Sequence, residues 1–164
     1  MPLRAVFLDT APLGLATQKS GRSAAGDACD KWVKTLMANG ASIYVPGIAD
    51  YELRRELIRN ANISSMARLD LFNRGAPSRY VPITTTAMLC AAELWARLHN
   101  NGTPTAAPDA IDGDAILAVQ VLTFCLEQGV PQADVVVASA NVRHLSRMVA
   151  SEVWANLSAV TPPL

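Results

Sequence analysis

The stretch Arg4-Ala-Val-Phe-Leu-Asp-Thr10 decides the fold, because it joins a run of apolar residues directly to an acid. An unbroken apolar run of this length is typical of a strand buried on both faces, as in a parallel sheet. We therefore predict a strand over Arg4–Leu8, stopped by Pro12. Asp9 follows this strand directly, and we can assign it no local capping role. An acid in this position indicates a functional site.

The rest of the chain alternates strands with helices, separated by turn residues such as Pro46-Gly47 and Gly129. Further strands are predicted over Ser42–Val45, Arg79–Ile83, Asp134–Ala138 and Trp154–Val160. Helices are predicted over Ala24–Ala38, Ile48–Asn60, Ser64–Asn73, from the Thr84–Thr86 cluster to Leu98, over Ile111–Gln128 and over Val142–Val149. This order predicts a three-layer α/β/α sandwich with a central, mainly parallel sheet. No repeat, low-complexity tract or linker interrupts it, so residues 1–164 should form a single domain.

The bulk composition is that of a globular protein, with 51% hydrophobic and 17% charged residues. The longest apolar run, Ile111–Leu126, contains two acids and a glutamine, so it should not span a membrane. No secretory leader is evident, and we expect a cytoplasmic protein. The cysteines are odd in number and isolated among apolar neighbours, which favours buried free thiols: Cys29, Cys90 and Cys125.

Charge is unevenly distributed although the formal net charge is zero. Arg54 to Arg79 contains six arginines and two acids, a net charge of +4, whereas Ala106 to Asp134 contains five acids and no Lys or Arg, a net charge of −5. The first segment could face phosphates and the second could hold cations. Two ordinary solvated faces would give the same pattern.

Several acids should converge on one edge of the predicted sheet, because ligands of open parallel sheets bind beyond the carboxyl ends of the strands. Asp9 ends the first strand and Glu52 lies about one helical turn beyond the second, while Asp112 and Asp114 open a helix. Carboxylates that are brought together repel one another unless a cation neutralises them. Oxygen ligands without Cys or His favour Mg²⁺ or Mn²⁺ over zinc.

Most of these acids also have a purely structural interpretation. Asp114 could be a first-turn helix acid and Asp112 an N-cap. Glu52 could pair with Arg55 or Arg59 along its own helix. Asp9 is the hardest to explain in this way, and the combination carries more weight than any single residue.

Other α/β chemistries lack their motifs. The sequence has no Gly-x-Gly-x-x-Gly, no phosphate loop ending in Gly-Lys-Ser/Thr and no Gly-x-Ser-x-Gly elbow. A phosphatase that uses a strand-end aspartate as nucleophile usually has a second aspartate two residues later, where this chain has Ala11. His99 is expected to cap a helix rather than to act in catalysis.

Four segments resemble those of PIN domains in order and spacing: Val6–Thr10, Tyr51–Leu57, Asp112–Ala118 and Ala138–His144. In particular, the chain resembles the VapC-type toxin ribonucleases of toxin–antitoxin operons, over nearly its whole length. Each motif is short, and the resemblance is supported mainly by the occurrence of all four motifs in the right order.

The resemblance implies a role for each matching residue. Asp9, Glu52 and Asp114 match the family's catalytic, metal-holding acids, and Asp112 is a supplementary acid. Asn141 stands where the family often has an aspartate, which keeps an oxygen ligand but removes a charge, so a second metal ion is expected to bind only when the substrate phosphate supplies that charge. Ser139 lies near a family threonine that hydrogen-bonds a carboxylate, and Thr10 is a second accessory residue. Candidate phosphate contacts are Arg54, Arg55, Arg59 and Arg143.

The function implied is Mg²⁺- or Mn²⁺-dependent endoribonuclease activity that leaves a 5′-phosphate and a 3′-hydroxyl. The resemblance also implies a homodimer held silent by a cognate antitoxin, for which the apolar residues of Ile63–Phe72 are one candidate surface and core packing their alternative use. A catalytically weak or inactive PIN-like module that binds RNA or protein is the alternative function, motivated by Asn141 and the neutral net charge. A DNA-directed 5′-nuclease fits less well, because such enzymes usually carry long insertions. The RNA target stays open.

Overall fold

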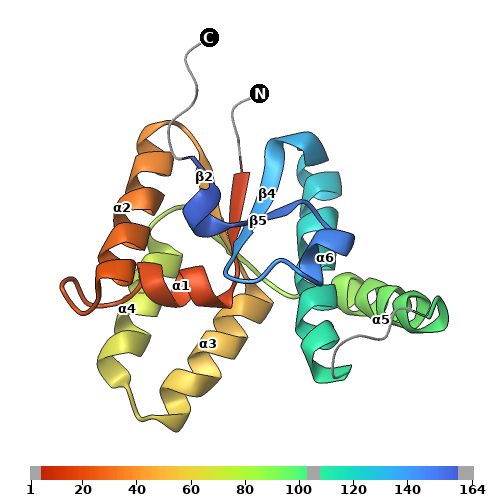
Figure 1. The fold of residues 1–164 in the computed structure, drawn as a ribbon, viewed down its shortest axis with the longest axis horizontal. Helices are drawn as coiled ribbons and strands as arrows, with labels where there is room; N and C mark the ends of the chain where they lie inside the picture. The colour runs from red at the N-terminus through yellow and green to blue at the C-terminus, as the bar shows by residue number, and fades with distance from the viewer. Residues whose placement is uncertain (1–4, 103–107, 159–164) are drawn as a thin grey trace.

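A five-stranded parallel sheet forms the centre of the protein in a computed structural model that describes residues 5–102 and 108–158, without the side chains of residues 108–111 (Figure 1). The strand order is β3-β2-β1-β4-β5, and every pair is parallel. The strands are β1 (Ala5–Leu8), β2 (Ser42–Pro46), β3 (Tyr80–Val81), β4 (Val135–Ser139) and β5 (Ser151–Val153). The predicted sheet, expected to be mainly parallel, is confirmed.

Helices cover both faces of the sheet. The α-helices are α1 (Thr10–Ala16), α2 (Ala24–Ala38), α3 (Gly47–Arg59), α4 (Ile63–Arg74), α5 (Thr85–Asn100) and α6 (Pro108–Gln128). Short 3-10 turns are η1 (Gln132–Asp134), η2 (Leu145–Arg147) and η3 (Trp154–Asn156). No described helix is long and apolar enough to cross a membrane.

The alternation of side chains along β1 divides the core in two. Val6 and Leu8 pack with α1, α2 and α4, whereas Phe7 faces α6 on the other side of the sheet. On the α6 side Phe7 stacks on Tyr44 at 5.0 Å and meets the edge of Phe124 at 5.2 Å between ring centroids. Because both faces of β1 are covered, the strand is apolar throughout, as its sequence indicated.

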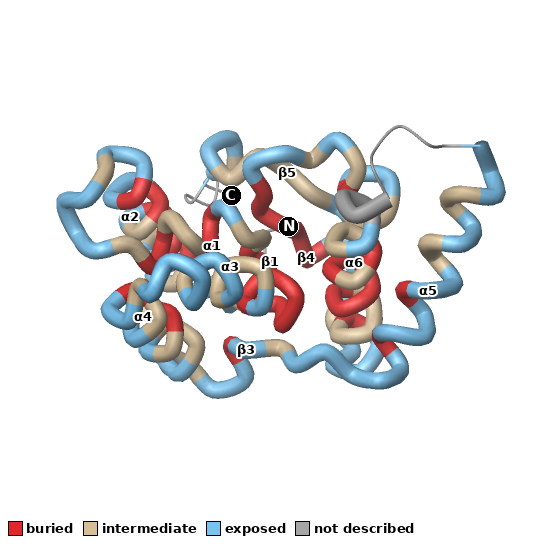
Figure 2. Tube along the Cα trace, turned by 90° about the horizontal axis from the view of Figure 1, so that it is seen from below, coloured by how far each residue is buried: buried red, intermediate tan, exposed pale blue. Residues whose placement is uncertain are grey.

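Helix α5 lies outside this sandwich and is supported by α6 (Figure 2). Only Ala87 and Ala91 of α5 are buried, and both belong to a small cluster with Val119 of α6. The prediction that all three cysteines are buried is therefore wrong for Cys90, which faces outward on α5. Cys29 and Cys125 are buried free thiols, as expected.

Several predicted boundaries are also wrong. Helix α1 was not predicted, because Pro12 and Gly14 disfavour a helix, yet proline is tolerated within a first helical turn. Only the turn η2 forms within the predicted helix Val142–Val149. The edge strand lies at Ser151–Val153 rather than over Trp154–Val160, of which residues 159–160 lie outside the described residues. Arg4, the predicted start of β1, lies outside them as well.

Buried Gln120 ties α6 to the strand ends. Its side-chain oxygen accepts from the backbone N–H of Ile48 at 3.1 Å, and its nitrogen donates to the carbonyl of Val81 at 2.9 Å. These bonds satisfy backbone groups that the start of α3 and the end of β3 would leave unpaired. They also hold the start of α3 against α6, and both helices carry predicted site residues.

Candidate active site

Asp9 is held in place by three hydrogen bonds at the carboxyl end of β1. Its backbone N–H donates to the carbonyl of Ala138 at 2.9 Å, and its carboxylate accepts from Thr10 N at 2.7 Å and from Ser139 Oγ at 2.6 Å. Asp9 is also the N-cap of α1, so the statement that it has no capping role is wrong. The missed helix explains the error. Ser139 thus hydrogen-bonds a carboxylate, as the matching family threonine often does, and its accessory role in the site stays a prediction.

Glu52 enters the same edge from α3. Thr10 Oγ1 donates to Glu52 Oε2 at 2.5 Å, so the residue after Asp9 orients the second acid. The other oxygen of Glu52 lies against the backbone of Gly113 on α6, so closely that a Cβ at Gly113 would collide with it. Gly113 therefore leaves room for the Glu52 carboxylate beside α6, and a side chain at position 113 would make that carboxylate shift. Sequence reasoning missed this role, and a helix-weakening glycine between two acids was the available signal.

Asp114 completes the group from α6. Burial, with added repulsion from Asp9 and then Glu52, raises the pKa of the Asp114 carboxyl to about 6. The bonds of Thr10 to Asp9 and Glu52, and the position of Glu52 beside Gly113, bring the three acids to the same edge. Helix α6 begins at Pro108, so Asp114 lies beyond its first turn and the first-turn interpretation is wrong. Glu52 does not pair with Arg55 or Arg59 either: Arg55 lies over the Tyr51 ring and Arg59 binds Glu56.

The three acids lack a cationic partner within the described part of the chain. No described Lys, Arg or His forms an ion pair with Asp9, Glu52 or Asp114. Among the described residues, no three Asp, Glu, His or Cys side chains already enclose a metal position. The donor set nevertheless fits a hard divalent cation, since it offers only carboxylate oxygens whose mutual repulsion a cation would relieve.

Asp112 and Asn141 are placed less favourably than these three. Asp112 lies inside α6, so its N-cap interpretation is wrong, and it lines a hollow against α5 together with Met88 and Trp95. Asn141 Oδ1 accepts from the backbone N–H of Arg143 at 3.1 Å and so closes its own turn. The ligand roles predicted for Asp112 and Asn141 stay predictions, which this geometry does not favour.

The four predicted phosphate contacts differ in how far they are already engaged. Arg54 binds Asp50 through Nε at 2.8 Å and Asp70 through its terminal nitrogen at 2.8 Å, which joins α3 to α4. Arg59 pairs with Glu56 on the surface, and Arg143 is exposed beside the carboxyl end of β4. The geometry gives Arg54 a structural use, whereas Arg143 is exposed shortly after the carboxyl end of β4.

Solved structures share this fold, although no family model matches the sequence and no curated protein does so. One is the crystal structure of VapBC2 from Rickettsia felis bound to a DNA fragment from their promoter. A chain in it is similar with a TM-score of 0.61 and 16% identity, over 90% of this chain and 97% of that one. A chain of FitAcB from Neisseria gonorrhoeae is similar with a TM-score of 0.60 and 15% identity, over 93% and 99%. These likenesses confirm the predicted α/β, PIN-like fold.

Proposed function

We propose that this chain is a Mg²⁺- or Mn²⁺-dependent endoribonuclease, with Asp9, Glu52 and Asp114 as the residues that hold the metal. The observation that carries the proposal is the grouping of three carboxylates without a cationic partner among the described residues. Such a grouping costs stability unless a ligand offsets it, which is why strongly perturbed acids concentrate at functional sites. Its place beyond the carboxyl ends of parallel strands is where such folds bind ligands.

The chain's own residues prepare this site in complementary ways. A bound divalent ion supplies a water of lowered pKa and neutralises charge that develops on phosphate. Ser139 and the Thr10 N–H fix the two oxygens of Asp9, while the Thr10 hydroxyl fixes one oxygen of Glu52. The bonded oxygens keep lone pairs for a ligand, because a carboxylate oxygen accepts more than one bond. Asp114 must lose its proton to bind, so binding should weaken below about pH 6.

We also propose that the protein is a toxin with a small antitoxin partner, and a homodimer. The fold shared with chains of VapBC2 and FitAcB supports this, together with the motif resemblance. Two apolar side chains on α4 are largely exposed, Ile63 at 75% and Leu71 at 72% of their full accessible surface. They offer an apolar surface that a partner could bury. Buried Leu69 of the same helix serves the core, so core packing accounts for one face of this segment and the antitoxin contact of the other face is part of the proposal.

The test is cleavage of single-stranded and structured RNA by the purified protein with Mg²⁺, with Mn²⁺ and with EDTA. We expect cleavage with either metal and none with EDTA. Asp9→Asn should remove it, whereas Asp70→Asn, which makes the same change outside the site, should retain it. Equal cleavage by Asp9→Asn and the wild type would contradict the assignment. In cells, growth arrest on expression should be relieved by Asp9→Asn.

A PIN-like module that binds RNA or protein without turnover is the second candidate. It is favoured by the lack of a preformed metal cluster among the described residues and by the amide at Asn141. The discriminating result is RNA binding that is unchanged by Mn²⁺ and yields no product over long incubation.

A further inference from the structure

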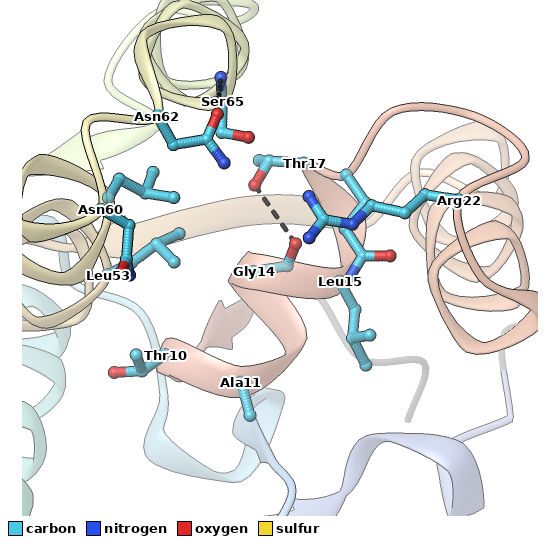
Figure 3. Close-up of a pocket in the computed structure, with 12 residues that line it drawn as sticks. Thr10, Ala11, Gly14, Leu15, Thr17, Arg22, Leu53, Asn60, Asn62 and Ser65 are labelled. Carbon is cyan, nitrogen blue, oxygen red and sulfur yellow. Dashed lines mark hydrogen bonds between the residues drawn. The ribbon is translucent and has the colours of Figure 1, made fainter.

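Two adjoining hollows lead away from Thr10, the residue that orients Glu52. The larger, of about 650 Å³, lies between α1, α3 and the start of α4 (Figure 3). The smaller, of about 440 Å³, lies between the loop at residues 18–23 and α4. Arg22, Asn62 and Ser65 line both, so the hollows form one groove, which we call the α1–α4 groove. Both volumes are in the range of small-molecule binding sites.

The two hollows differ in chemistry. Gly14, Leu53 and Leu57 give the larger one an apolar lining, and amide side chains, among them Asn60 and Asn62, lie at its border. Figure 3 shows the Arg22 guanidinium turned toward Thr17 and Asn62 across this hollow. An apolar surface bordered by amides suits a nucleobase, whose faces stack and whose edge forms hydrogen bonds.

The smaller hollow is cationic. Lys19, Arg22 and Arg68 line it, with serine hydroxyls and no acid among its lining residues. Arg68 is fixed there, since its Nε donates to the carbonyl of Thr17 at 3.1 Å and its terminal nitrogen to Ser65 Oγ at 2.7 Å. Asp27 of α2 accepts from Gly21 N of this loop at 2.9 Å and is not among the lining residues. Cations and hydroxyls of this kind suit a phosphate.

We propose that the α1–α4 groove binds the RNA strand beside the scissile bond, with one base in the larger hollow and a neighbouring phosphate in the cationic one. The inference rests on the proposed nuclease function and names how its substrate is held. The groove begins at Thr10, so a strand in it passes directly to Glu52 and Asp9. RNA fits better than a peptide, because a mainly apolar or basic peptide would leave three cations unmatched.

The first experiment measures binding without cleavage. A short fluorescein-labelled single-stranded RNA is titrated in EDTA against the wild type, Lys19→Ala/Arg22→Ala and the matched control Lys31→Ala/Lys34→Ala on the outer side of α2. We expect the groove variant to lower the magnitude of the slope of log K against log salt by about 0.7, the contribution of the one phosphate that the cationic hollow would hold. The control should keep the wild-type slope. A groove variant with an unchanged slope overturns the proposal.

The second experiment fills the larger hollow. A Cβ at Gly14 would meet its nearest atom, Leu53 Cδ1, at 3.5 Å, an ordinary contact, so side chains are tolerated there. Gly14→Leu extends into the hollow, and Gly14→Ala controls for the backbone change. Because stacking of one base is worth about tenfold in affinity, we expect Gly14→Leu to raise KM about tenfold with kcat retained. Gly14→Ala, which adds one methyl group to the hollow, should raise KM much less than Gly14→Leu. Equal KM values for Gly14→Leu and Gly14→Ala overturn the base site.

The two proposals can fail separately. If the wild type never cleaves RNA but the groove variant loses binding as described, the nuclease assignment falls and the groove stands. If the wild type cleaves and both groove variants match it, the groove falls and the nuclease stands. If Lys19→Ala/Arg22→Ala keeps full RNA binding and cleavage but escapes inhibition by an antitoxin peptide, the occupant is a peptide and the RNA proposal is overturned.

Discussion

Two acids of α3, Asp50 and Glu52, lie two residues apart and have opposite surroundings. Asp50 is 6% exposed and accepts from Arg54 Nε at 2.8 Å and from Asn73 Nδ2 at 2.8 Å. Glu52 accepts from the Thr10 hydroxyl and has no cation among its described partners. The charge of Asp50 is therefore neutralised by another residue of the chain, whereas the charge of Glu52 is available to an external ligand.

The same contrast extends to the clusters around these two acids. Asp70 joins Asp50 on Arg54, which makes a paired network between α3 and α4. Asp9 and Asp114 join Glu52, where each added charge opposes the next. Unpaired acids that repel one another lower stability, so such a cluster persists where function requires it. Asp50 and Asp70 therefore stabilise the fold through ion pairs, whereas Asp9, Glu52 and Asp114 are expected to bind a ligand. Substitutions at these two sets of acids should have different effects.

The largest expected effect is on catalysis, from Asp9→Asn. We expect RNA cleavage to fall by at least about 10³-fold, because metal-ion catalysis is worth several kcal/mol of barrier. Stability should change little, since the amide oxygen can still accept from the Thr10 N–H and the amide nitrogen can donate to Ser139 Oγ, which reverses the present bond. Initial rates and urea unfolding curves of the same preparation measure both. A large loss of stability with cleavage retained would place Asp9 among the structural acids.

The reverse pattern is expected for Asp50→Asn. Removing one partner of a buried pair leaves Arg54 partly uncompensated, and we expect a loss of about 3 kcal/mol in the free energy of unfolding. The remaining contact with Asp70 keeps the loss near the low end for such pairs. Below its lowered melting temperature, the variant should cleave RNA at the wild-type rate. A stable but inactive variant would contradict the division.

The pH dependence of stability provides a third test, on the metal-free protein in EDTA. The folded chain holds the Asp114 proton up to about pH 6, whereas the unfolded chain releases it near pH 4. The free energy of unfolding should therefore fall as pH rises between these values, by about 2 kcal/mol after allowance for solvent access. Asp114→Asn should remove this fall, and the exposed-site control Glu127→Gln should keep it. Identical curves for Asp114→Asn and the wild type would contradict the placement.

The smallest expected effect comes from Thr10→Val, which removes the hydroxyl that orients Glu52. Loss of a group that orients a metal ligand typically costs about tenfold in affinity or activity. We expect that loss in the Mn²⁺ concentration needed for half-maximal cleavage. Thr123→Val is the matched control, because the Thr123 hydroxyl bonds only to carbonyls of its own helix. Equal metal requirements in both variants would make the Thr10 bond incidental.

The sequence could predict the convergence of the acids, because one topological rule brings the carboxyl ends of parallel strands to one edge. Asp9 and Glu52 follow from it, whereas the choice of Asp114 over Asp112 came from the family resemblance. The helix α1 could not be predicted in the same way, since Pro12 and Gly14 oppose helix locally and packing on α2 and α3 outweighs them. With α1 missed, the capping role of Asp9 was missed too.

The sequence also did not predict contacts between parts of the chain that are distant in sequence. The pairing of Arg54 with Asp70 joins two helices and leaves no mark in local spacing. The approach of Glu52 to Gly113 depends on how α3 and α6 pack. Cys90 is exposed because α5 packs outside the sandwich on α6, whereas its apolar neighbours in sequence indicated burial.

The most direct test of the account is calorimetric titration of Mn²⁺ into the wild type, Asp9→Asn and Asp70→Asn. The account predicts a bound Mn²⁺ ion in the wild type and in Asp70→Asn, with binding abolished or at least about tenfold weaker in Asp9→Asn. No Mn²⁺ binding by the wild type, or equal binding by Asp9→Asn, would contradict the claim that these acids are left unpaired for a metal.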